Sequence, residues 1–245
     1  MSRAQRVCRA AWLVGTLLVG QSATADIEGA YYDIPTPVYG HGVLPGGEYA
    51  ALGVRLSDGR EIGVGLHEAV FEDTTPRLVD LDGDGSAEVI AVVSYFDRGA
   101  AVRIYDEIAA ADDPKGTTVA LVAETPPIGR RHRWLAVVGA ADLDGDGAVE
   151  IAYIDRPHLA RTLRVWRYRE GRLEQVAELD GLTNHRIGER DIAGGIRHCG
   201  GAPEMIVADA NWERLIAVTL TGGALNRRDI GPHLGRQSFA NALAC

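Results

Sequence analysis

The sequence contains the same acidic string twice, each time directly before a run of β-branched residues. DLDGDGSAE begins at Asp80 and DLDGDGAVE begins at Asp142. Asp at positions one, three and five, with Glu at nine, sets oxygen ligands along a tightly turned loop, and calcium accepts six to eight such ligands. Four acids on one turn repel each other unless a cation neutralises them. We therefore predict two calcium sites, with an Asp/Gly-rich hairpin turn that binds nothing as the alternative.

Each predicted site has four side-chain ligands and one backbone carbonyl at position seven. The first set is Asp80, Asp82, Asp84, the Ser86 carbonyl and Glu88, and the second is Asp142, Asp144, Asp146, the Ala148 carbonyl and Glu150. We expect the two ions to be mainly structural rather than catalytic.

The residues that follow each loop exclude an EF-hand. An EF-hand needs an acid at position twelve and flanking helices, but here position twelve is Ala91 or Tyr153. The runs Val89 to Val93 and Ile151 to Ile154 favour a buried strand because β-branched side chains pack well on a pleated surface. Each loop is thus expected to join two strands.

The pattern DxDGDGxxE before an apolar strand resembles the calcium loop of FG-GAP or VCBS repeats, which occur in the β-propeller of integrin α chains and in many bacterial secreted proteins. Two copies match at every ligand position. The resemblance implies a propeller with calcium in loops between strands. It implies no activity, since these repeats occur in adhesion proteins, lectins and accessory domains of enzymes.

Short apolar segments also recur as hairpins at near-constant spacing. Their turns lie at Asp58-Gly59, Gly116, Glu170-Gly171 and Gly222-Gly223, with steps of 57, 55 and 52 residues. Further strand pairs precede the last three hairpins: RLVDL with EVIAVV, WLAVVGAADL with EIAYID, and IGERDI with EMIVAD. Four strands per unit of about 50 residues is typical of a propeller blade. We predict one all-β domain over residues 26–245, a propeller of about four blades without convincing helices.

The first unit lacks a clear inner strand pair because residues 29–47 are rich in Gly and Pro. Two arrangements are possible. In the first, the missing strand comes from Gly235 to Cys245 and closes the ring, and in the second, the ring stays open.

The N-terminal 25 residues are typical of a secretory signal. Arg3, Arg6 and Arg9 precede an apolar stretch, and Ala23-Thr24-Ala25 forms a small-residue cleavage site. We expect cleavage after Ala25 and a periplasmic or secreted protein without a membrane anchor. Removing three arginines and no acids takes the net charge from −9 to −12, which argues against nucleic acid or anionic membranes as partners.

Two cysteines remain in the processed chain, Cys199 and Cys245. In an oxidising compartment such a pair is most simply interpreted as one disulfide. Cys199 falls in an altered third copy of the loop between Asp191 and Glu204, where Ala193 and Gly195 replace carboxylates. We predict no calcium there and hypothesise that the covalent link replaces the ion.

A basic and aromatic set stands out in this acidic chain. Its members precede the second calcium loop, follow the strand after it, or lead into the next unit: Arg130, Arg131, His132, Arg133, Trp134, Arg156, His158, His185 and Arg186. Arginine forks and a tryptophan suit an acidic glycan or an acidic protein surface. The alternative is a solvated face whose arginines pair with the many acids.

The sequence thus favours a calcium-stabilised binding module for a protein or an acidic glycan over an enzyme. Neither HExxH nor GxSxG occurs, which disfavours a zinc hydrolase and a serine hydrolase. The enzyme alternative is a carbohydrate- or phosphoester-cleaving protein that uses an Arg/His-lined mouth.

Overall fold

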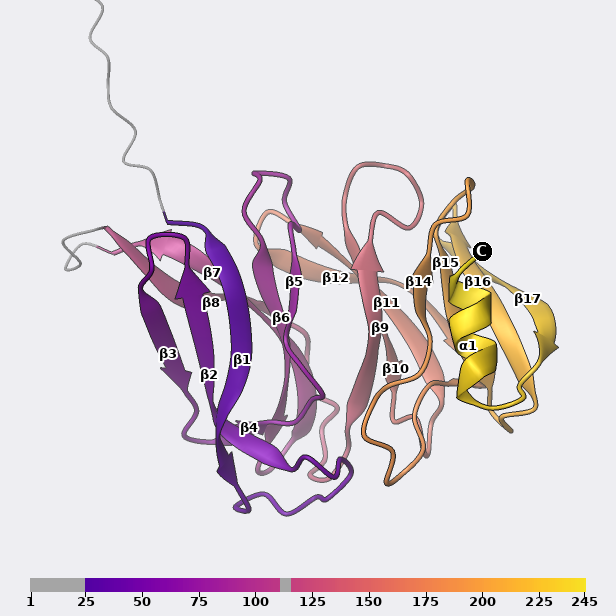
Figure 1. Ribbon diagram of the computed structural model, residues 1–245, viewed down its shortest axis with the longest axis horizontal. Coiled ribbons are helices and arrows are strands. Elements are labelled where there is room, and N and C mark those ends of the chain that lie inside the picture. Colours follow the sequence, from indigo (N-terminus) through magenta and orange to yellow (C-terminus); the bar gives the residue numbers. More distant parts are fainter. Residues whose placement is uncertain (1–24, 111–115) are drawn as a thin grey trace, which may run out of the picture.

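The computed structural model describes residues 25–110 and 116–245, which form antiparallel β-sheets and one short helix (Figure 1). The predicted secretory signal, residues 1–25, lies outside the described residues except for Ala25. Within these ranges, no helix is both long and apolar enough to cross a bilayer. The prediction of an all-β chain is confirmed.

The strands belong to three sheets. The first has the order β1-β2-β4-β6-β7-β8, with β3 on β2 and β5 on β6, and the second has the order β12-β11-β10-β9. The third has the order β13-β15-β16-β17, with β14 also on β15. The bounds are β1 Ile27–Thr36, β2 Glu48–Leu56, β3 Glu61–Gly65, β4 Ala69–Phe71, β5 Arg77–Val79, β6 Glu88–Tyr95, β7 Gly99–Ala109, β8 Thr117–Glu124, β9 Leu135–Ala141, β10 Glu150–Asp155, β11 Thr162–Arg169, β12 Arg172–Asp180, β13 Leu182–Thr183, β14 Gly195–Arg197, β15 Glu204–Asp209, β16 Arg214–Thr221, β17 Ala224–Pro232 and α1 Arg236–Leu243.

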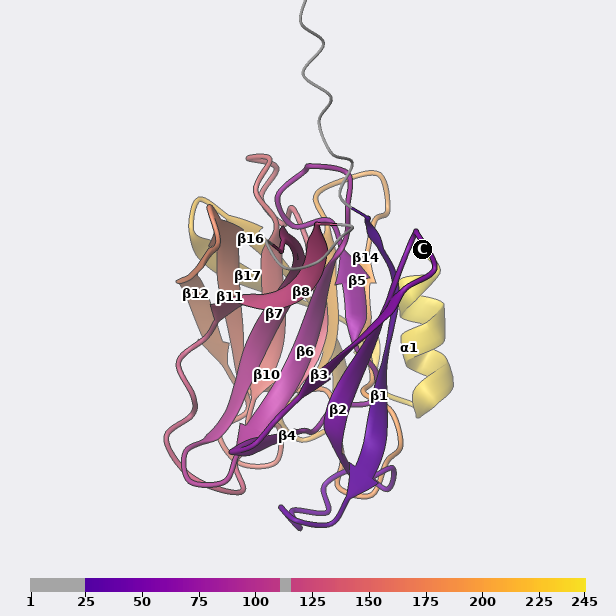
Figure 2. The ribbon, with the colours of Figure 1, turned by 90° about the vertical axis from the view of Figure 1, so that its left-hand side faces the viewer.

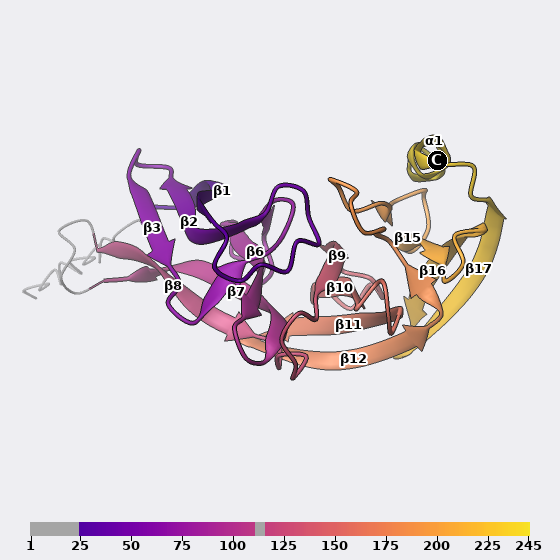
Figure 3. The same cartoon turned by 90° about the horizontal axis from the view of Figure 1, so that it is seen from below.

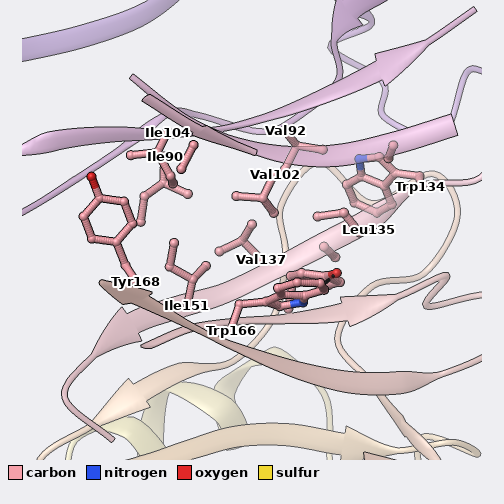
Figure 4. Close-up of a cluster of buried hydrophobic side chains, with 14 of the residues drawn as sticks. Ile90, Val92, Val102, Ile104, Trp134, Leu135, Val137, Ile151, Trp166 and Tyr168 are labelled. Atoms are coloured by element: carbon pink, nitrogen blue, oxygen red, sulfur yellow. Dashed lines mark hydrogen bonds between the residues drawn. The ribbon is translucent and has the colours of Figure 1, made fainter. Parts of the chain in front are cut away.

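The inner strand of each sheet is buried on both faces. In β6, Ile90 and Val92 pack into a cluster shared with the second sheet, whereas Val89, Ala91 and Val93 pack toward β1 and β2. Successive side chains of a strand point to opposite faces, so a strand between two packed layers needs an apolar residue at every position. Figure 4 shows the first of these clusters, in which Ile90 and Val92 meet Val137, Ile151 and Trp166.

The same alternation places β10 between the first and third sheets and β15 between the second sheet and α1. Ile206 and Ala208 of β15 pack with Phe239 of α1, which is 4% exposed. The prediction that Gly235 to Cys245 supplies a closing strand is therefore wrong. It forms a helix that covers the outer face of the last sheet, and the expectation of no helix is wrong at this one place.

The sheets lie one behind another along an arc (Figures 2 and 3). Figure 3 places β1–β3 at one end of the arc and β17 with α1 at the other. The arrangement brings β8 against β12 and β12 against β17. The number of blades and the closure of a ring stay predictions.

All four predicted hairpins form, as β2/β3, β7/β8, β11/β12 and β16/β17. Three other expectations are wrong. Residues 27–36 form the long strand β1, which pairs with β2. The short strand β4 joins β2 to β6, so the first two units share one sheet. β15 pairs with β13 and β14 rather than with the segment IGERDI.

Candidate functional site

The first acidic loop connects β5 to β6, and backbone amides hold its carboxylates facing inward. Asp80 accepts hydrogen bonds from the amides of Gly83 (2.7 Å) and Gly85 (3.2 Å), and Glu88 accepts one from Leu81 (2.5 Å). Both glycines have positive φ, 81° and 98°, which explains why positions four and six of the string are Gly. The loop therefore has a fixed conformation with its oxygens gathered on one side.

Ligand oxygens of Asp80, Asp82 and Glu88 lie within 4.8 Å of one another. That separation is about twice a Ca–O bond of 2.3–2.6 Å. Glu88 is fully buried and its Oε1 has no hydrogen-bond partner. A buried carboxylate oxygen without a partner is costly unless a cation meets it, so the first loop fits calcium.

The strand next to this loop adds further negative charge. β6 and β7 pair Val89 with Tyr105, so Asp106 takes the place opposite Glu88, one step further along. Burial raises the pKa of Glu88 to about 7, and the charges of Asp106 and Asp82 add to the shift. Burial also raises the pKa of Asp106 to about 7, together with its hydrogen bond to Glu107. The described residues place no arginine in an ion pair with this group.

The second acidic loop connects β9 to β10 and repeats the backbone pattern. Asp142 accepts hydrogen bonds from the amides of Gly145 (2.7 Å) and Gly147 (3.0 Å), and Glu150 accepts one from Leu143 (2.8 Å). Oxygens of Asp142, Asp144 and Asp146 lie within 4.8 Å of one another. Glu150 is not part of that group, in contrast to Glu88 in the first loop.

A guanidinium accounts for this difference. Arg167 of β11 lies opposite Glu150 in the ladder. Its Nε donates to Glu150 Oε1 (2.6 Å), its Nη2 donates to Asp144 Oδ2 (2.6 Å), and its Nη1 lies 3.1 Å from Asp146 Oδ2. Burial raises the pKa of Glu150, and the hydrogen bond from Arg167 opposes that shift. The second loop thus carries an internal cation where the first has Asp106.

The two loops lie at the same end of the sheets. A cleft of about 390 Å³ between them is lined by Asp82 of the first loop and Asp146 of the second, together with Tyr168 and Arg169. Both sets of predicted ligands therefore lie on one acidic end of the molecule.

The third equivalent position, between β14 and β15, has no such carboxylate group among the described residues. Cys199 and Cys245 lie at disulfide-bonding distance, with their Cα atoms 5.7 Å apart. Glu204, the counterpart of Glu88 and Glu150, pairs with Arg197 (2.6 Å) and Arg228 (2.6 Å). Arginine and a covalent link hold this position.

The basic and aromatic set lies at the opposite end of the same sheets. β9 and β10 pair Ala141 with Glu150 at the acidic loop and Leu135 with Asp155 at the other end. Five or six residues of strand, at about 3.3 Å each, separate the two ends by roughly 17–20 Å. The segment before β9 and the turn after β10 therefore meet on one surface.

A pocket at this end has room for about 30 Å³ and brings part of the predicted set together. Its lining residues are His41, His132, Arg133, Trp134, Arg156, Pro157, His158 and Leu159. Two of these, His132 (φ 55°) and Arg156 (φ 48°), have a left-handed backbone. Such strained residues cluster at functional sites more often than elsewhere. This pocket is therefore a candidate binding site.

Four histidines lie at this pocket or directly behind it, in two pairs. The rings of His41 and His132 stack at 5.0 Å, and His41 Nδ1 lies 2.7 Å from Glu72 Oε1. His158 Nε2 lies 3.0 Å from His185 Nδ1. The Trp134 indole lies against the second pair, with ring centroids 6.3 Å from His158 and 4.9 Å from His185, and donates through Nε1 to the Glu72 carbonyl (2.6 Å).

The hydrogen bonds define the tautomers of the second pair. His185 Nε2 lies 3.1 Å from the Glu189 carbonyl, which can only accept, so Nε2 carries the proton. His185 Nδ1 then accepts from His158 Nε2, and His158 keeps a lone pair on Nδ1. Burial lowers the pKa of His158 to about 4, with the nearby His185 and His41 adding to the shift. At neutral pH His158 is therefore an uncharged acceptor.

Several arginines at this end have no carboxylate partner. Among the described residues, Arg130, Arg131, Arg133 and Arg186 form no ion pair. Arg131 instead donates to the Tyr39 carbonyl (2.9 Å), and Arg186 lies over the Trp212 ring at 4.3 Å. These four arginines do not follow the expectation that surface arginines pair with the many acids. Arg156 follows it, because it binds Asp155 through two hydrogen bonds of 2.8 and 2.9 Å.

The structure brings His132, Arg133, Trp134, Arg156 and His158 to one pocket. His185 lies buried behind it, and Arg130, Arg131 and Arg186 are exposed beside it. Sequence reasoning missed His41. A local signal exists, because His41 is flanked by Gly40 and Gly42, which both take positive φ.

Comparison with known proteins finds no family model that matches the chain and no curated protein that is similar to it.

Proposed function

We propose that this chain is an exported, calcium-stabilised module of the FG-GAP/VCBS propeller type, which binds an acidic protein or an acidic glycan. The observation that carries the binding role is the group of Arg130, Arg131, Arg133 and Arg186, none of which pairs with an acid in a chain of net charge −9. Arginines left unpaired among so many carboxylates are available to an external anion.

The composition of the pocket supports binding rather than hydrolysis. Its lining contains no Asp, Glu, Ser or Cys among the described residues, so the usual nucleophiles and carboxyl acids are missing from it. Trp134 is 2% exposed and belongs to the core. The ligand therefore meets the exposed arginines and the rim of the pocket rather than a deep cavity.

Calcium has a supporting role in this proposal. The carboxylates of the acidic loops would hold the ion, whose charge offsets their mutual repulsion. The loops thereby fix the start of β6 and β10, and these same strands lead to the turns of the basic end. The ligand surface is thus positioned by strands that begin at the metal loops.

The test is binding to a panel of sulfated and carboxylated oligosaccharides and acidic peptides. A double variant, Arg130→Gln with Arg186→Gln, should weaken the best binder by roughly thirtyfold, since each charge-assisted contact contributes about 1 kcal/mol. The matched control is Arg172→Gln with Arg227→Gln, which removes the same charge from exposed positions on β12 and β17. Equal loss in both variants, or no binder in the panel, would contradict the proposal.

One observation favours an enzyme as the second candidate. His41 is oriented by Glu72, and Ser94 Oγ donates to the other oxygen of Glu72. A carboxylate that orients an imidazole is a common arrangement for a general base. Turnover of a glycan or phosphoester substrate that is lost in His41→Ala or His158→Ala, with the fold retained, would establish catalysis in place of binding.

A further inference from the structure

We infer that the two acidic loops are not equivalent, and that calcium binds the first loop while Arg167 takes the place of the ion in the second. This inference rests on the proposed calcium-binding role of the loops. It predicts one tightly bound calcium per chain instead of the two that the repeated string suggests.

The first step is the cross-strand residue. Each loop ends in a buried glutamate that begins an inner strand, and the residue opposite that glutamate points to the same side of the sheet. Opposite Glu150 this residue is Arg167. Opposite Glu88 it is Asp106, since Val89 pairs with Tyr105. The same position therefore adds a guanidinium to one loop and a carboxyl group to the other.

The second step is the set of carboxylates that Arg167 contacts. Its three contacts go to the acids at positions three, five and nine of the string, Asp144, Asp146 and Glu150. These are three of the four predicted side-chain ligands of the second loop. A guanidinium stays protonated at any working pH, so calcium has to displace it and break charge-assisted hydrogen bonds that are stronger than neutral ones.

The third step is the state of the first loop. Glu88 has no exposed surface, and its Oε1 is unpartnered in a group that includes Asp80 and Asp82. Among the described residues no arginine pairs with these acids. The first loop thus lacks an internal substitute for the ion, and an external cation is the remaining way to neutralise it.

The experiment is a measurement of calcium stoichiometry and affinity on the chelator-stripped, full-length processed protein, by titration calorimetry or equilibrium dialysis with calcium alone. We expect one site per chain. The matched variants change the third position of each loop, Asp82→Asn and Asp144→Asn. The first should lower the affinity by at least tenfold, and the second should leave the number of sites and the affinity unchanged.

The variant Arg167→Gln should raise the stoichiometry from one to two, because it removes the guanidinium while keeping an uncharged polar side chain. A circular dichroism spectrum and a melting temperature for each variant separate loss of the site from loss of the fold. Asp82→Asn, on an exposed residue, avoids the buried Glu88.

Two sites of similar affinity in the wild type would overturn the inference while leaving the calcium-binding role intact. So would a single site that is lost in Asp144→Asn and kept in Asp82→Asn. An unchanged single site in Arg167→Gln would show that Arg167 is not what excludes calcium. No calcium binding at all would overturn both the inference and the calcium role in the proposed function.

Discussion

The two ends of the stacked sheets carry opposite unbalanced charges. At one end, the first loop gathers carboxylates that lack a basic partner among the described residues, and at the other end four arginines lack an acidic partner. Between the two ends, ion pairs such as that of Arg103 with Glu124 (3.2 Å) are complete. On the proposed function, a cation would meet the charge left over at one end and an anionic ligand would meet the charge left over at the other.

The acidic end itself shows three solutions to one problem. Among the described residues, no arginine pairs with the carboxylates of the first loop, whereas Arg167 pairs with three of those in the second, although Asp144 Oδ1 there has no hydrogen-bond partner. The third position lacks such a carboxylate group and uses the disulfide of Cys199 with Cys245. Each solution holds the segment before an inner strand. Of the changes considered below, loss of the disulfide should lower stability most and removal of calcium should lower it less. The charging of His158, at the basic end, should have the smallest effect.

The first prediction concerns the disulfide. Replacing both cysteines by serine should lower the free energy of unfolding by about 4 kcal/mol, the loop-closure value for the separation of 46 residues. Denaturant unfolding of the oxidised wild type and the double variant measures this. The loss should be the same with calcium and with chelator, because the third position uses no ion. A loss of stability that appears only in chelator would contradict the claim that the disulfide acts independently of calcium.

The second prediction concerns calcium. Saturating calcium at a hundredfold excess over its Kd should stabilise the fold by about 3 kcal/mol, because the ion binds only the folded loop. Thermal melts in calcium and in chelator measure the shift. The shift should vanish in Asp82→Asn and persist in Asp144→Asn. Identical melting temperatures of the wild type in calcium and in chelator would contradict the claim that a cation neutralises the acidic end.

The third prediction concerns His158 at the basic end. Its folded pKa, about 4, lies below the ordinary value of 6.5, so between these pH values the unfolded chain binds a proton that the folded chain does not. Stability from this group is therefore fully present above pH 6.5 and is lost as the pH falls toward 4. His185, His41 and Arg161 face the ring and oppose its charging.

His158→Phe should remove this part of the pH dependence, which is at most about 1.4 kcal/mol per pH unit and is reduced by solvent screening. Denaturant midpoints of wild type and variant at pH 7 and pH 5, in calcium, give the difference. A variant that loses as much stability as the wild type between these pH values would show that His158 does not contribute.

The sequence predicts the parts of the fold that depend on local chemistry. Hairpins formed around Asp58-Gly59 or Glu170-Gly171 because such turns need residues that tolerate positive φ, which Gly59, Glu170 and Gly171 adopt. The acidic loops are equally local, since Gly83 and Gly85 allow the chain to turn its amides toward Asp80.

The features that sequence reasoning missed depend on distant contacts. β1 contains Gly29 and Pro35, which disfavour a strand, and it forms where it pairs with β2. The C-terminal helix forms where Phe239 can cover Ile206 and Ala208. The role of Arg167 follows from a strand register that the repeated string does not contain. Local sequence patterns therefore predicted the turns and the acidic loops. Long-range packing determined the edge strand β1, the C-terminal helix and the residue that faces each loop.

The C-terminal helix ties the last layer of the molecule to the redox state of its surroundings. Arg197 donates to the Ala242 carbonyl (2.6 Å), and the disulfide fastens the chain just beyond it. Reduction would release the disulfide, and the helix would then be held by the Arg197 hydrogen bond and by the apolar contacts of Phe239. Reduction of the disulfide would therefore weaken the cover that this helix provides over Ile206 and Ala208 on the outer face of the last sheet.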